Sequence, residues 1–362
     1  MFEFLTRRVL NPPAFGLDIS DLTLKFVGLG RQGREHSLRY FGEMPIPPGV
    51  VMDGEIKKED DLIAVLIGGL RTAAGKIMRE RFVVASLPEE KSFVRVIELP
   101  GIKPEDVGHA VRWELEGVVP LSFKDITFDY QLLMRLAGSD DHRDVLITAF
   151  PRKIVESYHR VLAAAGLVPL ALELESQAIS RAIIAPELLS RPQIIIDSGA
   201  LRTSFIIFAG GSLIFTKSIS VGGHDFETAI AKSLGLSEAE ARQVKIAAGL
   251  SKIYRSGQVF QALEPQLRAL TAELERELWF YRDHPAKRHR SLGDIERIIL
   301  CGGDANLIGL DKYIATTIKK PTVLGNPFAN VKLESGAIPP IPRNEALKYT
   351  TALGLALRAA QE

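Results

Sequence analysis

Residues 16–27 read GLDISDLTLKFV, and residues 195–207 repeat the pattern as IIDSGALRTSFII. In each stretch an apolar run ends in an aspartate, Asp18 or Asp197, and a turn leads into a second apolar run. Short apolar runs separated by turn residues predict a β-hairpin. Since further strands and helices alternate behind both copies, the repeat predicts an α/β protein with two similar lobes.

Both predicted turns carry residues that suit a polyphosphate. Ser20 and Gly199 stand two positions after the aspartates, and Thr23 and Thr203 open the second strands. Backbone N–H groups of a tight turn can bind an anion, and a carboxylate can hold Mg²⁺ through water. Two such hairpins facing each other would hold a nucleotide's phosphates from both sides. The alternative is a pair of ordinary hairpins whose aspartates and small residues only form the turns.

A third motif, IILCGGDANLIGL at 298–310, combines a strand, a Gly302-Gly303 turn and the start of a helix that Asp304 or Asn306 can cap. Because glycine has no side chain, a flat ring can lie against the backbone there, which suits an adenosine. The alternative is a strand–helix turn that needs glycine only for its geometry. Taken with the two hairpins, the motif indicates a nucleoside site.

The composition is that of an ordinary globular protein. The chain has 362 residues, 46% of them apolar and 25% charged, with 45 Lys+Arg against 44 Asp+Glu. The length suggests two domains or one two-lobed fold. The near-zero net charge argues against a strongly basic nucleic-acid-binding protein. Cys301 is the only cysteine, which excludes an internal disulfide and fits a reducing cytosol.

No stretch supplies the roughly 20 apolar residues that a membrane-spanning helix needs. The longest apolar stretch, 193–215, is interrupted by Asp197 and Arg202, and residues 1–10 lack the apolar core of a secretory signal. The sequence therefore predicts a soluble protein without a transmembrane segment.

Between the two hairpins, residues 90–168 form a self-contained βαββα pattern that could fold over its own small sheet. The pattern predicts strands at 93–98, 126–133 and 144–149 and helices at 104–118 and 152–165. Residues 223–283 are almost wholly helical in pattern, with breaks at Gly235, Gly249 and Gly257. We therefore expect an inserted subdomain in the first lobe and a helical subdomain in the second.

The order and spacing of the three motifs resemble the actin/Hsp70/sugar-kinase superfamily. Within it the chain is most similar to the PilM family of type IV pilus assembly, which is related to the division protein FtsA. The stretch EGVVPLSFKDITFDYQLL at 116–133 is the most specific part of this resemblance. Further matching stretches lie at 15–27, 98–133, 147–169, 194–208, 218–250, 298–314 and 352–358. The resemblance covers nearly the whole chain and implies an actin-like ATPase fold.

The resemblance also implies subdomain limits. They are a first-lobe core at 1–89 completed by 169–190 and 344–362, an inserted FtsA-like subdomain at 90–168, a second-lobe core at 191–222 plus 295–343, and a helical subdomain at 223–294.

By this resemblance three loops bind ATP. The implied nucleotide-binding residues are Asp18, Ser20, Thr23 and Lys25 on the first phosphate loop; Asp197, Gly199, Ala200 and Thr203 on the second; Gly302, Gly303 and Asn306 on the adenosine loop; and Lys245 on the helix beside the nucleoside. Asp18 and Asp197 are expected to hold Mg²⁺ through water.

Two positions depart from the family's pattern. Ser20 stands where the family usually has glycine, and its Cβ narrows the loop although its hydroxyl can donate to a phosphate. Arg242 stands where the family usually has the glutamate that lies three residues before the nucleoside-flanking lysine. Its presence removes a ribose acceptor unless Glu238 or Glu240 substitutes from the same helix. The alternative is that these charged residues form a solvated helix face.

The resemblance implies a cytoplasmic, ATP-binding scaffold of the inner-membrane platform of a type IV pilus, or of a related secretion or competence system. The implied partner is the N-terminal cytoplasmic peptide of a PilN-like inner-membrane protein, with pilus motor ATPases as further candidates and no nucleic acid. The scaffold would sit at the inner membrane through these partners. The alternatives are an actin-superfamily ATPase or small-molecule kinase, and an FtsA-like filament-forming division protein. Any ATP hydrolysis is expected to be slow.

A partner groove is expected where the inserted subdomain meets the first lobe, beside strand 126–133 and helix 104–118. One side of that strand is apolar, and an extended or helical peptide could lie against it. The alternative is that this apolar side is the subdomain's own core.

Glu173 and Glu175 alternate with leucines as strand residues do, and one of them could face the cleft and orient water near the γ-phosphate. An edge strand would explain the pair equally well.

Overall fold

The computed structural model describes residues 13–32, 35–72, 80–119, 121–133, 142–284, 292–331 and 341–360. Some sequence expectations lie wholly or partly outside the described residues. They concern residues 1–10, the end of a helix expected over 60–76, a polar loop expected at 284–294 and a proline-rich connector expected at 338–342.

The first lobe is built on a five-stranded sheet. Its order is β10 (Val168–Leu174), β6 (Phe82–Leu87), β1 (Ala14–Ile19), β2 (Thr23–Gln32) and β3 (Glu35–Pro45). Strand β2 pairs antiparallel with both β1 and β3, whereas β6 pairs parallel with both β1 and β10. The expected hairpin is β1–β2, and Asp18 pairs with Lys25 across it.

The second lobe repeats this topology. Its order is β13 (Ser212–Ile219), β12 (Thr203–Ala209), β11 (Gln193–Ser198), β14 (Arg297–Cys301) and β15 (Thr322–Leu324). Three antiparallel strands are again followed by two parallel ones. Every residue of β12 is buried, as its nearly continuous apolar run requires. The repeat in the sequence therefore corresponds to a duplicated core, which confirms the two-lobed α/β fold.

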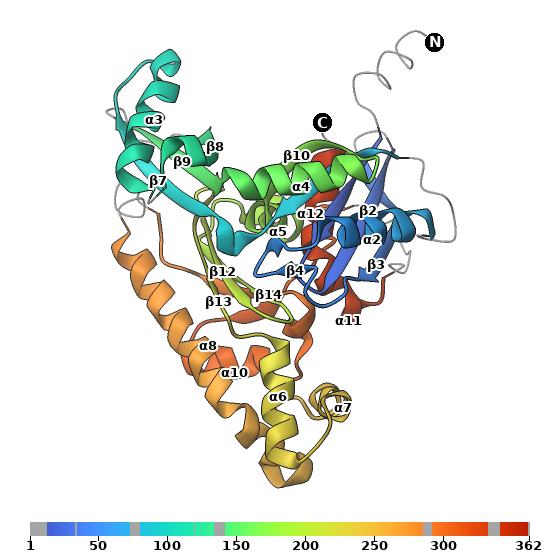
Figure 1. Ribbon diagram of the computed structural model, residues 1–362. Coiled ribbons are helices and arrows are strands. Elements are labelled where there is room, and N and C mark those ends of the chain that lie inside the picture. The colour runs from blue at the N-terminus through green and yellow to red at the C-terminus, as the bar shows by residue number, and fades with distance from the viewer. Residues whose placement is uncertain are drawn as a thin grey trace.

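Two helices, α5 and α12, lie between the sheets of the two lobes and pack closely against each other (Figure 1). Helix α12 (Thr350–Ala359) packs on β1, and α5 (Glu175–Ile183) packs on α12. A Cβ on Gly354 would lie 1.8 Å from the carbonyl oxygen of Ala178 in α5. Glycine at this position therefore lets the two helices approach each other. The sequence predicts one final helix over 344–360; the structure divides this segment into a short helix α11 (Arg343–Ala346), a 3-10 helix at Leu347–Tyr349 and α12.

The outer face of the first sheet is covered by α2 (Glu59–Thr72) and α4 (Arg152–Ala164), with a small hairpin of β4 (Val51–Met52) and β5 (Glu55–Ile56) beside them. Tyr158 of α4 is buried, and its hydroxyl donates to the Gly54 carbonyl at 3.1 Å. Helix α4 thus packs on the first lobe. It also contacts β8 and β9 of the inserted sheet, on the face away from the β7–β9 residues that pack on α3.

The inserted sheet has the order β7 (Phe93–Pro100), β9 (His142–Pro151), β8 (Ile126–Leu132). Helix α3 (Val107–Val118) covers one face, where Val111 and Leu115 pack against Val145 and Ile147. Figure 1 shows this unit projecting from the upper left of the molecule.

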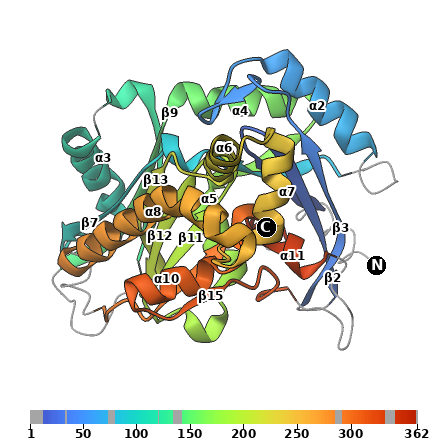
Figure 2. The same ribbon diagram turned by 90° about the horizontal axis from the view of Figure 1, so that it is seen from below.

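The second lobe carries the helices α6 (Gly223–Leu234), α7 (Glu238–Ala248), α8 (Gln258–Asp283) and α10 (Leu310–Ile318), which Figure 2 shows from below. The expected breaks at Gly235, Gly249 and Gly257 are all present, and each glycine has a positive φ. That conformation is available to glycine at little cost and ends a helix.

Among the described residues, no helix is both long enough and apolar enough to cross a membrane.

Candidate functional site

A cleft of about 590 Å³ separates the two lobes, and the turns of both repeated hairpins line it. Its volume lies within the roughly 300–1,000 Å³ that small-molecule sites occupy. Ten of the twelve residues expected to bind nucleotide line this cleft. They are Asp18, Ser20, Thr23, Lys25, Asp197, Gly199, Ala200, Lys245, Gly302 and Gly303. Their roles toward a nucleotide stay a prediction.

The two hairpin turns are closed in the same way. In the first, the Ser20 N–H donates to the Thr23 carbonyl at 3.0 Å; in the second, the Gly199 N–H donates to the Arg202 carbonyl at 2.9 Å. Both donors stand two positions after the aspartate that ends the strand. The repeat is therefore one of local geometry as well as of sequence.

The Ser20 hydroxyl is used inside its own turn. It donates to the Thr23 carbonyl at 2.9 Å and lies 3.1 Å from the Thr23 hydroxyl. The Lys25 ammonium in turn donates to that hydroxyl at 2.6 Å. The Ser20 side chain thus adds hydrogen bonds to the turn that a glycine could not make. The Lys25 ammonium is held beside the turn by its bond to the Thr23 hydroxyl.

The pKa values of the two aspartates that end the first strands of the hairpins, Asp18 and Asp197, are both raised. Burial raises the pKa of Asp18, while the nearby Lys25 ammonium and a hydrogen bond from Ser86 act to lower it. Burial also raises the pKa of Asp197 to about 6, and the Asp18 carboxylate adds to this increase. Two carboxylates that resist ionisation together favour a cation between them.

Gly302 brings the third motif against the second hairpin. Its φ is +88°, and a Cβ there would lie 2.4 Å from the Ser198 carbonyl oxygen and 2.5 Å from Oδ1 of Asp197. Any other residue would therefore push the 302–303 turn away from the strand end.

Lys245 lies in the cleft, but two carboxylates hold its ammonium. Glu227 is 2.8 Å away and Asp304 is 2.5 Å away. The lysine therefore ties α6 and α7 to the 302–304 turn. Glu240 is the N-cap partner of Ser237 in α7, and neither it nor Glu238 lines the cleft. The carboxylate that reaches this part of the cleft is Glu227, which the sequence analysis missed because it lies on the preceding helix.

Two expected residues lie outside the cleft lining. Thr203 is buried, and its hydroxyl donates to the Val221 carbonyl at 2.7 Å. It thereby holds the segment before α6 against β12. The Asn306 amide faces its own turn and donates to the Gly303 carbonyl at 3.4 Å. Both side chains therefore hydrogen-bond to the backbone of the loops and do not face the cleft.

Arg202 is the main residue that the sequence analysis missed. It comes from the second hairpin and reaches first-lobe carboxylates: Asp21 at 3.2 Å, Asp53 at 3.3 Å and Glu90 at 3.1 Å. Lys348, which precedes α12, also lines the cleft and pairs with Glu43 of β3 at 2.7 Å. Nothing in the local sequence marks these pairs, because their members are far apart along the chain.

Glu173 and Glu175 point to different cavities. Glu175, the first residue of α5, lines the cleft; burial, together with the Asp18 and Glu90 carboxylates, raises its pKa well above the usual range. The expectation that one of the pair faces the cleft thus holds for Glu175. Glu173 instead lies under Arg181 and Arg358, on the far side of the strand.

The cleft fits a metal-bound nucleotide better than a free one. Eight carboxylates line it, against five lysines and arginines. The carboxylates are Asp18, Asp21, Glu43, Glu90, Glu175, Asp197, Glu227 and Asp304. A bare polyphosphate would be repelled by this excess unless a cation came with it. Within the described residues, no three His, Cys, Asp or Glu side chains form a ready metal cluster. The set therefore suits Mg²⁺ that keeps its waters and its phosphate ligands.

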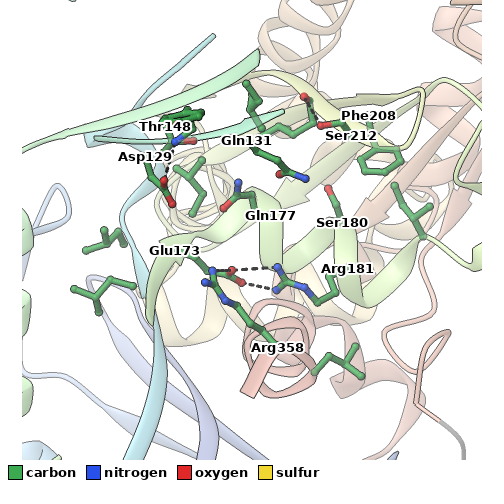
Figure 3. A pocket seen from close by; sticks show the side chains of 18 of the residues that line it. Asp129, Gln131, Thr148, Glu173, Gln177, Ser180, Arg181, Phe208, Ser212 and Arg358 are labelled. Atoms are coloured by element: carbon green, nitrogen blue, oxygen red, sulfur yellow. Dashed lines mark hydrogen bonds and ion pairs between the residues drawn. The ribbon is translucent and has the colours of Figure 1, made fainter. Parts of the chain in front are cut away.

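A second cavity, of about 860 Å³, lies between the inserted sheet and α5 (Figure 3). It is lined by β8, β9, α5 and the end of α12, together with residues of the second lobe near Phe208 and Ser212. Helix α3, which was expected to border the partner groove, lies on the other face of the inserted sheet. The apolar side of β8 belongs partly to that subdomain's own core, since Ile126 and Phe128 pack toward α3.

Comparison with known proteins gives one family. A family model described as "Type IV pilus assembly protein PilM" matches residues 16–360. A solved structure described as a "PilM-PilN type IV pilus biogenesis complex" superposes with a TM-score of 0.82 and 27% identity, covering 97% of this chain and 100% of that one.

More distant relatives share the fold. The cell division protein FtsA of Agrobacterium fabrum is 26% identical over 179 residues, which is 44% of this chain but only 38% of FtsA. MreB5 of Spiroplasma citri, solved with ADP bound, has a TM-score of 0.57 at 15% identity, with 96% of each chain covered. These similarities confirm the actin-like ATPase fold.

Proposed function

The chain belongs to the family of the type IV pilus assembly protein PilM, and on that premise we propose that it is an ATP-binding scaffold of the pilus assembly platform. In this proposal Mg²⁺–ATP lies between the lobes, and the N-terminal cytoplasmic segment of a PilN-like membrane protein lies in the second cavity. The scaffold then works in the cytoplasm and meets the inner membrane through that partner.

The nucleotide part rests on the paired hairpins. The two turns have the same closing hydrogen bond, they face one cleft, and each is preceded by an aspartate with a raised pKa. Asp18 and Asp197 would hold hydrated Mg²⁺, and the turns at Ser20 and Gly199 would hold phosphates. Mg²⁺ would supply the positive charge that the acidic cleft lacks.

The partner part rests on the second cavity and on the similarity to the PilM–PilN structure. The cavity lies where the inserted sheet meets the first lobe, as expected for the partner groove. Its lining combines apolar side chains such as Leu146 and Phe150 with the polar side chains of α5. A short peptide gains affinity from a few buried anchors in such a groove.

The proposal is tested by calorimetric titration of the full chain with ATP, once with Mg²⁺ and once with excess EDTA, in the presence and absence of the partner peptide. Thermal unfolding gives a second readout, because a nucleotide that binds only the folded state raises the free energy of unfolding by about 2.7 kcal/mol when its concentration is a hundred times Kd. We expect binding with Mg²⁺ and none with EDTA. Equal binding under both conditions, or none at millimolar Mg²⁺–ATP, would contradict the nucleotide part.

Slow ATP hydrolysis is a second function that one observation favours. Glu175 is half-buried and lines the cleft, where the Asp18 carboxylate acts to raise its pKa. A carboxyl group in this position can orient a water molecule and hold its proton. We expect turnover far below the roughly 10 s⁻¹ of a median enzyme. A small-molecule kinase and a filament-forming division protein gain no comparable support from the cleft.

A further inference from the structure

Arg242 differs from the other cations of the cleft between the lobes. The lysines and arginines that line this cleft are Lys25, Arg202, Arg242, Lys245 and Lys348. All of them except Arg242 lie within 4.0 Å of a carboxylate. Arg242 has no ion-pair partner in the part of the chain that the structure describes, and it is exposed. Its N–H donors are therefore available to a ligand.

Helix α7 presents one face to the cleft. Arg242, Lys245 and Ile246 all line it, and their spacing of three and four residues places them on the same side of the helix. Glu238 lies one turn before Arg242, at the spacing of a helical ion pair, but it does not line the cleft and the described side chains form no such pair. Arg242 therefore contributes its side chain to the cleft.

The start of α6 shows which part of the cleft this face of α7 borders. The Gly223 N–H donates to the Gly199 carbonyl at 3.0 Å, so α6 begins against the turn of the second hairpin. The Gly223 carbonyl accepts from the Lys245 ammonium at 3.3 Å, and a Cβ on Gly223 would lie 2.1 Å from Oδ2 of Asp304. The second hairpin, α7 and the turn that carries Asp304 therefore meet at Gly223.

The ribose of a bound nucleotide would lie at this junction. In the proposed function the 5′-phosphates lie against the hairpin turns, and the base lies against the backbone of residues 302–303. The ribose joins these two parts, and the side chains that line the cleft between them include Glu227 on α6 and Lys245 and Arg242 on α7. Glu227 and Asp304 already hold Lys245, at 2.8 Å and 2.5 Å. Arg242 is then the cation that can still bind a ligand.

The charges around Arg242 allow an anion to approach. Burial raises the pKa of Asp304, whereas the Lys245 and Arg242 charges act to lower it, so Arg242 lies within electrostatic range of this carboxyl group. Glu227 and Asp304 are balanced by Lys245 and Arg242, so the charges of this group sum to zero when all four are ionised. The carboxylate excess of the cleft lies elsewhere. An anionic group beside Arg242 therefore needs no metal ion to offset repulsion.

A carboxylate and a guanidinium select different groups on a ribose. A carboxylate accepts hydrogen bonds from the ribose hydroxyls, whereas an arginine beside the ribose accommodates a phosphate attached to it. Arginine has five N–H donors and no acceptor, and its planar fork can bind two phosphate oxygens at once. Arg242 thus suits a phosphorylated ribose better than a free ribose.

We propose that the cleft takes a nucleotide that carries a further phosphate on the 2′ or 3′ position of its ribose, and that Arg242 selects this phosphate. The inference rests on the proposed nucleotide site and adds the substrate class to it. The 5′-phosphates and Mg²⁺ keep the positions proposed above, and Arg242 binds the ribose phosphate through charge-assisted hydrogen bonds. Ile246, one turn after Arg242 and 58% exposed, offers an apolar contact to the nucleoside.

The test compares matched ligands on the full chain with Mg²⁺ present. An ATP analogue labelled on its γ-phosphate, so that the ribose stays free, is displaced by adenosine 5′-monophosphate, adenosine 2′,5′-bisphosphate or adenosine 3′,5′-bisphosphate. Fluorescence anisotropy then gives the three affinities on one scale. We expect wild type to bind one of the two bisphosphates roughly tenfold or more tightly than the monophosphate. The better bisphosphate identifies the ribose position that faces Arg242.

Substitutions at Arg242 test the residue itself. Arg242→Gln removes the charge and should bring the affinity ratio of bisphosphate to monophosphate close to one. Arg242→Glu should reverse the preference through like-charge repulsion, and Arg242→Lys should keep part of it. The control is Arg268→Gln, because Arg268 is an exposed arginine of α8 that does not line the cleft, and it should keep the wild-type ratio. Thermal unfolding checks that each variant is folded.

The outcomes separate the two proposals. If the labelled ATP analogue does not bind wild type, the nucleotide part of the proposed function is contradicted and the ribose-phosphate inference falls with it. If the analogue binds but neither bisphosphate competes better than the monophosphate, the ribose-phosphate inference alone is overturned. A wild-type preference that survives in Arg242→Gln overturns it as well.

Discussion

Arg202 Nη2 lies 3.2 Å from Oδ2 of Asp21, and this ion pair joins the turn of the second hairpin to the turn of the first. The same guanidinium pairs with Glu90 at 3.1 Å, and Asp21 also accepts the Gly54 N–H at 2.9 Å. Arg202 and Asp21 are both largely buried. The contact therefore fixes the spacing of the two phosphate-loop candidates, and that spacing decides what the cleft can hold.

Replacing Arg202 should loosen the lobes. Arg202→Gln leaves Asp21 and the mostly buried Glu90 without their counter-charge, which costs about 1–3 kcal/mol of unfolding free energy. The control is Arg191→Gln, whose pair with Glu296 is about half exposed and contributes less than about 1 kcal/mol. Urea unfolding of both variants measures the difference. Equal midpoints would show that the pair does not hold the lobes.

Asp197→Asn should stabilise the chain while abolishing its response to Mg²⁺–ATP. Burial raises the pKa of Asp197 to about 6, from the 3.8 of an aspartate in water. Because the folded pKa is raised, the wild type loses stability as pH rises from about 4 to about 6, by on the order of 2–3 kcal/mol in total. The asparagine variant escapes this loss.

The measurement is thermal unfolding of wild type and Asp197→Asn between pH 4 and pH 8, with and without nucleotide. The stability gap should be full at pH 8, shrink below pH 6 and be nearly gone at pH 4. A gap that is constant across this range would show that the Asp197 charge is not the cause.

Gly302→Ala should destabilise the third motif. The substitution places a methyl group 2.4 Å from the Ser198 carbonyl oxygen at a backbone φ of +88°, which we expect to cost at least about 2 kcal/mol. Gly303→Ala is the matched control, because the atom closest to its new Cβ would be Cβ of Lys348 at 3.7 Å. Its stability should change by less than about 1 kcal/mol. Chemical denaturation of the two variants decides the matter, and similar losses would mean that the close approach at Gly302 is unimportant.

Glu175→Gln should separate nucleotide binding from turnover. The side chain lines the cleft but comes from the N-terminus of α5 and belongs to neither phosphate turn, so Mg²⁺–ATP should still bind with an affinity close to wild type. Any hydrolysis should fall about 10²-fold or more, as on loss of a general base. Phosphate release assays and calorimetry measure the two effects, with the exposed Glu187→Gln as control. Unchanged turnover would exclude Glu175 from the chemistry.

The cleft between the lobes could be predicted as far as its elements are local in sequence. The hairpin at Asp18 and Thr23 needs only apolar runs and turn residues a few positions apart, and the helix breaks need only glycine. The side-chain partners of Lys245 could not be predicted, because Glu227 and Asp304 reach it from another helix and from the 302–304 turn. Strand β3 was missed, since its run of mixed polar and apolar residues carries no clear period.

The second cavity could likewise be predicted only in part from the sequence. The alternation along residues 126–132 correctly indicates a strand, but it cannot say which neighbour takes each face. Helix α3 packs on the face that carries Ile126 and Phe128, and α5 and α12 place Arg181 and Arg358 in the lining of the cavity. Those residues are far from β8 in the chain and meet it only through the packing of the first lobe.

The sequence by itself determined the duplicated α/β core, the two phosphate-type hairpins and the glycine turn at 302–303, because each follows from backbone preferences and apolar periodicity within about a dozen residues. The tertiary structure alone decided that Arg202 bridges the lobes, that Thr203 turns away from the cleft and that Glu173 and Glu175 serve different cavities. Each of these contacts joins side chains from elements that are far apart in the chain. Their positions are set by the packing of those elements, so a short stretch of sequence cannot predict them.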